Sequence, residues 1–275
     1  MNFRRDLDNA LAAAMIGSNV MMSYYEKDYK EEDGTDPHRM VVTEADAKTQ
    51  EAVLDFLLAR YWPKYGIFAE EGEWREDPSR FECPFHWQVD PIDGALGFYE
   101  RTGSFGISIA LVSKEGRAFV GVLHNPARHL LAYACAGAPA VVNNQPVVPS
   151  QRTPEDPLRI MTWSFQVDTP EMKRVLDLFP DEWVLTAESN VAEAISVFTG
   201  EADMSFGLPG NMIHSWDLAA MACIAQQSSC VLTDFRGEPI HLNREASIWP
   251  NGFILSNGLL HGYAVERLAE WRADT

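Results

Sequence analysis

WQVDPIDGALGF (Trp87–Phe98) is the most informative segment of the sequence. Its apolar beginning predicts a short buried strand over His86–Asp90. The strand ends in two aspartates, Asp90 and Asp93, and Pro91 stiffens the backbone between them. Taken alone, an Asp-Pro-Ile-Asp-Gly sequence is also compatible with a simple turn. The surrounding sequence is therefore needed to distinguish a simple turn from a functional site.

Three further segments place carboxylates at the end of a predicted strand or at the start of a predicted helix. They are FAEEG at Phe68–Gly72, HSWD at His214–Asp217 and TEAD at Thr43–Asp46. Each acid alone has a structural explanation, because Asp and Glu are common at helix starts and in solvated loops. Together, carboxylates without paired His or Cys side chains predict a site for hard cations such as Mg²⁺ or Mn²⁺. Two such ions about 4 Å apart can bind the attacking and leaving oxygens of a phosphoryl transfer.

The residues after Asp93 favour phosphate binding. Gly94 permits close approach of the backbone, and the amides of Gly94 and Ala95 can bind phosphate oxygens at a helix start. Asp217 lies in the other half of the chain, so we expect the site where the two halves meet.

The rest of the chain predicts an α/β (α+β) fold in two halves. The first half, residues 1–150, begins with a helix over Arg4–Tyr25 and an exposed loop over Glu26–His38, placed where it can act as a lid. Thr43 and Asp46 resemble a capping pair at the start of a second helix. Closely spaced strands follow and predict an antiparallel sheet; they cover Gly66–Ala69, His86–Asp90, Phe105–Val112, Ala118–Leu123 and Leu130–Ala134.

A segment rich in proline and polar residues, Pro149–Pro157, predicts a domain boundary. Beyond it, residues 151–275 alternate strands with helices and form an α/β domain that contributes Asp217. The predicted helices there are Glu171–Phe179, Val191–Phe198, Trp216–Gln227 and a closing helix near Leu259–Trp271. The predicted strands are Leu158–Trp163, Trp183–Leu185, Ala202–Phe206, Cys230–Thr233 and Phe253–Ser256.

The formal net charge of −18 argues against duplex nucleic acid as a partner. If the ligand is a phosphate, either a local basic pocket or bound cations must reverse the local field, and the carboxylates favour cations. No stretch has the roughly 18 uninterrupted apolar residues that a membrane span needs. The four cysteines have no metal-ligand spacing. We therefore expect a cytoplasmic protein that binds neither nucleic acid nor membrane.

The order of these segments resembles the inositol monophosphatase family of magnesium-dependent, lithium-sensitive phosphatases. The most specific likeness is Trp87–Phe98, which is similar to the family's W-x-x-D-P-I/L-D-G-T-x-N-F signature. Shorter likenesses are Val42–Asp46 to V-T-x-x-D, Ala69–Glu71 to G-E-E, Gly121–Pro126 to G-V-x-x-x-P, Trp216–Ala220 to W-D-x-A-A and, more loosely, Cys230–Asp234 to G-G-x-V-T-D. The resemblance covers residues 4 to 270.

The resemblance implies an alternating αβαβα layered sandwich and two or three Mg²⁺ ions. Glu70, Asp90 and the Ile92 carbonyl would hold the first ion. Asp90, Asp93 and Asp217 would hold the second, and a weaker third ion would lie near Glu70. The implied catalytic residues are Thr43, Asp46, Glu70 and Asp93, and the expected substrate-binding residues are Gly94, Ala95 and His214. For His214 we favour packing or hydrogen bonding at the helix start over acid–base catalysis. A homodimer is also implied.

The sequence departs from the family pattern at two positions. Ala95 replaces the threonine of D-G-T, so its amide remains but no hydroxyl orients water; loss of one such hydrogen bond commonly lowers the rate by roughly 10². Gly210 stands where many inositol phosphatases have an acid that binds sugar hydroxyls. Inositol itself is therefore in doubt as the substrate.

Two hypotheses follow. The leading one is a phosphomonoesterase acting on a small phosphorylated metabolite: an inositol phosphate, histidinol phosphate, a sugar phosphate or a 3′-phosphonucleotide. The alternative is a regulatory protein that binds metal and phosphate with little activity, which Ala95 and Gly210 favour. Retention of all four acidic metal ligands favours the enzyme.

Overall fold

The first half of the chain forms two long helices and a sheet. The computed structural model describes residues 2–26, 37–179, 182–210 and 212–273. The helical elements of this half are α1 (Arg4–Tyr25), α2 (Pro37–Tyr61), η1 (Gly72–Arg75), α3 (Ser79–Glu82) and α4 (Ala95–Tyr99). The strands are β1 (Gly66–Ala69), β2 (Phe85–Asp93), β3 (Gly106–Ser113), β4 (Ala118–Asn125), β5 (Leu130–Cys135), β6 (Val141–Val142) and β7 (Gln145–Pro146).

These strands make one sheet in the order β1-β2-β3-β4-β5-β6-β7. Every neighbouring pair is antiparallel, as predicted, except β1 and β2, which run parallel. The exception has a functional consequence, because parallel neighbours end at the same edge of a sheet. The end of β1, which leads into Glu70, therefore lies beside the end of β2.

The second half alternates strands and helices, as the sequence predicts. Its helices are α5 (Pro170–Leu176), α6 (Asn190–Phe198), α7 (Ser215–Gln226) and α8 (His261–Ala273). Its strands are β8 (Arg159–Trp163), β9 (Trp183–Ala187), β10 (Met204–Gly207), β11 (Cys230–Thr233) and β12 (Phe253–Asn257). They form a mixed sheet in the order β11-β12-β10-β8-β9. The division of the chain at residues 150 and 151 into two domains stays a prediction.

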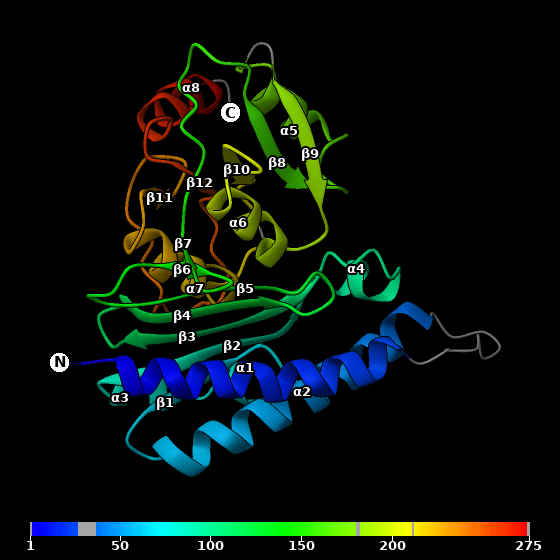
Figure 1. Cartoon of the computed structure of the whole chain (residues 1–275), viewed down its shortest axis with the longest axis vertical. Helices are drawn as coiled ribbons and strands as arrows, with labels where there is room; N and C mark the ends of the chain where they lie inside the picture. Colours follow the sequence, from blue (N-terminus) through cyan, green and yellow to red (C-terminus); the bar gives the residue numbers. More distant parts are fainter. Residues whose placement is uncertain (1, 27–36, 180–181, 211, 274–275) are drawn as a thin grey trace.

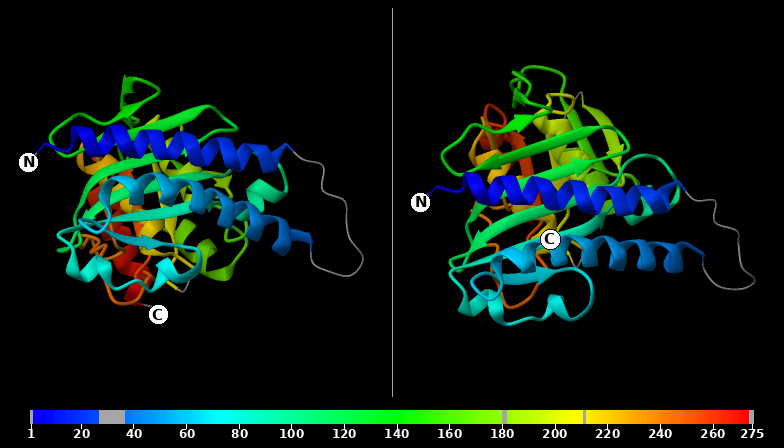
Figure 2. Two further views of the ribbon diagram at one scale, coloured as in Figure 1. Left: turned by 90° about the horizontal axis from the view of Figure 1, so that it is seen from below. Right: turned by 60° about the horizontal axis from the view of Figure 1, so that its bottom comes forward.

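Helices and sheets alternate in αβαβα layers (Figure 1). Helices α1 and α2 cover one face of the first sheet, and their buried side chains share a core with it (Figure 2). Helices α6 and α7 lie between the two sheets, in a core to which both halves contribute. Helices α5 and α8 cover the outer face of the second sheet. The predicted fold class is confirmed.

The start of α2 differs from the prediction. The helix begins at Pro37, so the prediction that Thr43 and Asp46 cap its start is wrong. Proline suits the first turn of a helix because its fixed φ is helical and its missing N–H would have no partner there. Most of the predicted Glu26–His38 loop, with its role as a lid, lies outside the described residues.

None of the helices in the described ranges is both long enough and apolar enough to cross a lipid bilayer.

Candidate metal centre

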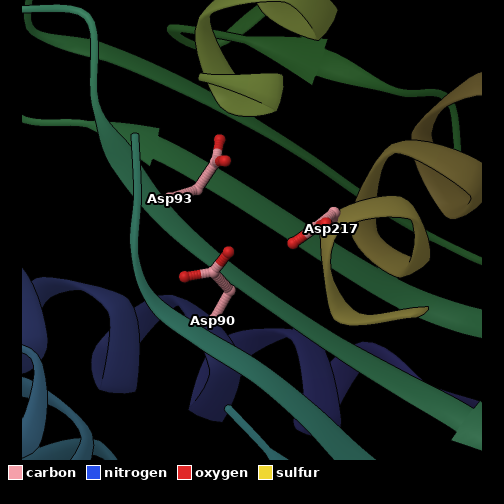
Figure 3. A group of neighbouring side chains, drawn as sticks. All are labelled: Asp90, Asp93 and Asp217. Carbon is pink, nitrogen blue, oxygen red and sulfur yellow. The ribbon is translucent and has the colours of Figure 1, made fainter. Parts of the chain in front are cut away.

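Three buried aspartates from the two halves of the chain meet at one point. Asp90 and Asp93 come from β2 and Asp217 from the first turn of α7. One carboxylate oxygen of each lies within 4.8 Å of the others, and Figure 3 shows the three side chains converging. The predicted site at the junction of the two halves is therefore present as a cluster of acids.

An irregularity in β2 brings Asp90 and Asp93 together. Successive side chains of a strand point to opposite faces, so residues three apart should face away from each other. Here Asp90 pairs with Ser108 but Asp93 pairs with Gly106, so three steps on β2 match two on β3. This bulge turns both carboxylates toward one space and takes the intervening residues, Pro91 and Ile92, out of the regular register.

Asp217 is fixed by the start of its own helix. The backbone N–H of His214, the N-cap residue of α7, donates a 2.7 Å hydrogen bond to Asp217 Oδ2. Burial raises the pKa of Asp217 well above its ordinary value, and the charges of Asp93 and Glu70 raise it further. The helix start therefore aims the carboxylate into an acidic site.

Asp93 is held by α6, in the other half of the chain. Its carboxylate accepts hydrogen bonds from the Val191 backbone N–H at 2.5 Å and from Asn190 Nδ2 at 3.2 Å. Burial raises the pKa of Asp93 to about 6, although these two hydrogen bonds act to lower it. Sequence reasoning missed Asn190, because an asparagine at a predicted helix start has an ordinary capping explanation.

Glu70 lies at the end of β1, beside the aspartates. Burial raises its pKa to about 7, while its hydrogen bond to Asp90 and the charge of Arg75 lower it. Arg75 Nε also donates a 2.9 Å hydrogen bond to the Glu70 carbonyl. Arg75 was not predicted as part of the site, since a lone arginine in a charged loop carries no signal in the sequence.

Asp46 joins this acidic group from α2. It is buried, and its pKa is raised well above the ordinary value by burial, then by the charges of Glu70 and Glu71. Thr43 lies inside α2, and its side chain is outside the described part of the structure. The structure therefore brings Asp46 to the site, and the catalytic role of Thr43 stays a prediction.

The acidic group fits a hard divalent cation. Its donors are carboxylate oxygens, which Mg²⁺ prefers, and mutual repulsion in a buried site is relieved when a cation binds. Within the described part of the chain, Asp90 Oδ1 and Asp46 Oδ1 are buried without a hydrogen-bond partner. These two carboxylate oxygens are therefore available to bind a cation.

Gly94 lies where the backbones of the two halves approach each other too closely for a side chain. Its φ of +88° is left-handed, and an added Cβ would lie 2.5 Å from Ser189 Cβ and 2.7 Å from the Ser104 carbonyl. The short helix α4 starts at the next residue, Ala95. The backbone at Gly94 and Ala95 thus turns directly after Asp93, where the sequence predicts phosphate binding.

His214 packs on the helix that carries Asp217. Its ring stacks on Trp216 with centroids 4.6 Å apart, and its Nδ1 is 3.0 Å from Ser247 Oγ. Burial, with the nearby charge of Arg75, lowers the pKa of His214 and favours its neutral form. Contact with a substrate stays a prediction for this residue.

Comparisons with known proteins point to one family and one fold. The sequence model of the inositol monophosphatase family matches residues 4–273. The chain is 28% identical to a fructose-1,6-bisphosphatase/inositol-1-monophosphatase of Thermotoga maritima, over 84% of this chain and 83% of that protein. It is 27% identical to the 3′(2′),5′-bisphosphate nucleotidase CysQ of Escherichia coli, over 91% of this chain and 99% of that one. The solved inositol monophosphatase II of Staphylococcus aureus superimposes with a TM-score of 0.81 at 21% identity, covering 98% of this chain and 96% of that chain.

Proposed function

This chain belongs to the inositol monophosphatase family, and we propose that Mg²⁺ held by Glu70, Asp90, Asp93 and Asp217 supports its phosphatase reaction. The chain is a phosphoric monoester hydrolase of small phosphorylated metabolites. The observation that carries the proposal is the convergence of Asp90, Asp93 and Asp217 within 4.8 Å, buried and drawn from both halves. Burying three carboxylates together is energetically costly, and a bound cation would offset that cost.

We assign the ligands as the resemblance implies. Glu70, Asp90 and the Ile92 carbonyl would hold one ion, Asp90, Asp93 and Asp217 a second, and a third would bind near Glu70. Mn²⁺ has similar ligand preferences and would also fit. When bound, the ions neutralise the phosphate dianion and lower the pKa of water, so that a nucleophile forms at neutral pH.

The protein's own groups position the reactants. Asp46, whose pKa burial raises, is suited to accept the proton that the attacking water loses. The N–H groups at Gly94 and Ala95 would donate to phosphate oxygens and orient the phosphorus for in-line attack. Ala95 offers no hydroxyl to align the water, so we expect turnover to be slower than with a threonine there.

The substrate class is a small phosphomonoester. The relatives named above act on fructose bisphosphate and inositol phosphate, or on a bisphosphorylated nucleotide, and these define the first substrates to test. Histidinol phosphate and other sugar phosphates remain candidates. Gly210 offers no side chain where many inositol phosphatases have an acid that binds sugar hydroxyls, and this argues against inositol itself.

We also propose that the protein is a cytoplasmic homodimer with no nucleic-acid or membrane partner, and that residues 1–150 and 151–275 act as two domains. The regulatory alternative is not favoured, because every acidic ligand is present and the relatives compared above carry enzyme names.

The experiment is a phosphate-release assay over a panel of phosphorylated metabolites, with Mg²⁺, with EDTA and with added Li⁺. We expect release from at least one class, loss with EDTA and inhibition by Li⁺. No release from any substrate, although the protein binds Mg²⁺, would contradict the proposed activity.

A further inference from the structure

The backbone that carries Glu70 is held at every polar group. The Glu70 N–H donates to the Val89 carbonyl at 3.1 Å, and the Glu70 carbonyl accepts from Arg75 Nε at 2.9 Å. The next residue, Glu71, has both its groups bound by one side chain: its N–H donates to Gln50 Oε1 at 2.8 Å, and its carbonyl accepts from Gln50 Nε2 at 2.7 Å. These four hydrogen bonds fix the backbone of the turn that carries both glutamates.

Gln50 makes this pair of bonds from inside the protein. Its side chain is only 5% exposed, whereas Arg75 is exposed to solvent. A buried hydrogen bond competes less with water than an exposed one, so Gln50 holds the turn more firmly than Arg75 does.

Gln50 also lies on the helix that carries Asp46. The two residues are four apart in α2, and side chains at this spacing share a helix face. The charges of Glu70 and Glu71 act on the Asp46 carboxyl, so the helix and the turn lie close together. Gln50 therefore joins the element that carries the proposed base to the element that carries a proposed ligand.

The amide of a glutamine can make both bonds at once. It offers a donor and an acceptor together, whereas a carboxylate only accepts and leucine does neither. Asparagine has the same amide on a stem one methylene shorter. The loss of either bond would leave a half-buried backbone group of Glu71 without this partner.

We propose that Gln50 is a positioning residue that fixes the Glu70–Glu71 turn against α2, so that Glu70, a proposed ligand, and Asp46, the proposed base, face the same site. The inference rests on the proposed function, because the cation is the reason for the alignment. It assigns to Gln50 no contact with substrate or metal.

The test is to measure the affinity for Mn²⁺ of the wild type, Gln50→Leu and Gln50→Asn. Electron paramagnetic resonance measures the concentration of the free ion. Residues that orient metal ligands typically contribute 10- to 100-fold to affinity, and we expect Mn²⁺ to bind Gln50→Leu weaker by about that factor. Activity of the variant should return as Mg²⁺ is raised, which a general loss of packing would not allow.

The matched control is Glu51→Gln, the adjacent residue of α2, whose exposed side chain pairs with Lys48. It should bind Mn²⁺ like the wild type. A folded Gln50→Leu that binds Mn²⁺ within about twofold of the wild type would overturn the inference.

Asp217→Asn separates this inference from the proposed function. If wild type and Asp217→Asn bind Mn²⁺ equally, the proposed metal centre is refuted. If Asp217→Asn binds Mn²⁺ more weakly but Gln50→Leu binds it like the wild type, only the proposed role of Gln50 is refuted. Should both Gln50 variants fail to fold, hydrogen exchange of the wild-type Glu71 amide decides. Protection that increases with Mn²⁺ supports the inference, and exchange at the unprotected rate overturns it.

Discussion

The carboxylate of Asp93, at the end of β2, accepts a 2.5 Å hydrogen bond from the backbone N–H of Val191, the second residue of α6. The bond joins the two halves of the chain at a proposed metal ligand. The N-terminus of a helix carries partial positive charge and favours the ionised carboxylate that a cation needs. The second half therefore contributes to the site through α6 as well as through Asp217.

Asn190→Ala should weaken metal binding. It removes the 3.2 Å hydrogen bond from Asn190 Nδ2 to Asp93 Oδ1 and leaves the Val191 bond in place. We expect affinity for Mg²⁺ to fall about tenfold, measured by calorimetry. Ser196→Ala, on the same helix but bonded to Glu201, is the control and should bind Mg²⁺ normally. Equal affinities for the two variants would refute a role for Asn190 in orienting Asp93.

Ala95→Thr should increase turnover. The added hydroxyl can orient the attacking water, and one positioned hydrogen bond is worth roughly 100-fold in rate. The measurement is kcat at saturating Mg²⁺ on the best substrate of the panel. Ala95→Val has nearly the same shape without the hydroxyl and should not increase kcat. The same gain in both variants would show that packing, rather than the hydroxyl, limits the wild type.

The stability of the metal-free protein should fall as pH rises. Burial raises the pKa of Glu70 to about 7 and that of Asp93 to about 6, above their ordinary values of 4.5 and 3.8. The folded state then holds protons that the unfolded state has lost, so the stabilisation is complete at low pH and disappears as pH rises through 6 and 7. In EDTA, Tm should be higher at about pH 5 than at about pH 8.

Mg²⁺ should reverse this trend, because it binds the ionised carboxylates of the folded state. In EDTA, Asp93→Asn should show a smaller difference between the two pH values than the wild type, since one titrating carboxyl is gone. A wild-type Tm that is the same at both pH values and unaffected by Mg²⁺ would be evidence against buried, mutually repelling carboxyls.

Gly94→Ala should destabilise the fold and abolish activity. The left-handed conformation alone costs about 1–2 kcal/mol in an L-residue, and the clash with Ser189 and Ser104 adds to it. The control is Gly137→Ala, where φ is +85° but no atom lies within 4 Å of the added Cβ. Thermal unfolding of both variants separates backbone strain from the clash. If Gly94→Ala is no less stable than Gly137→Ala, close packing around Gly94 does not require a glycine.

Much of the fold could be predicted because apolar periodicity reports directly on burial. The strands that lead to Asp90 and Glu70 appear as short apolar runs ending in acids, and both ends are found at the site. The start of α2 could not be predicted in the same way. Thr43 and Asp46 match a capping pattern, but the helix already begins at Pro37, and a local pattern does not exclude an earlier start.

The positions of the site residues relative to one another also could not be predicted from the sequence. Asp90 and Asp93 are three residues apart, a spacing that in a regular strand places them on opposite faces, and only the bulge between them turns them together. Asn190 contacts Asp93, which lies 97 positions before it, and Gln50 contacts Glu71, 21 positions after it. Such pairings depend on how the layers pack, which a single sequence does not record.

The most direct test of a carboxylate-held metal centre is phosphate release by wild type, Asp93→Asn and Asp55→Asn, each with Mg²⁺ and with EDTA. Asp55 is an exposed residue of α2, so its variant makes the same chemical change away from the site. We predict release by wild type and Asp55→Asn that requires Mg²⁺, and none by Asp93→Asn. Release that persists in EDTA, or in Asp93→Asn at the wild-type rate, would contradict the metal centre.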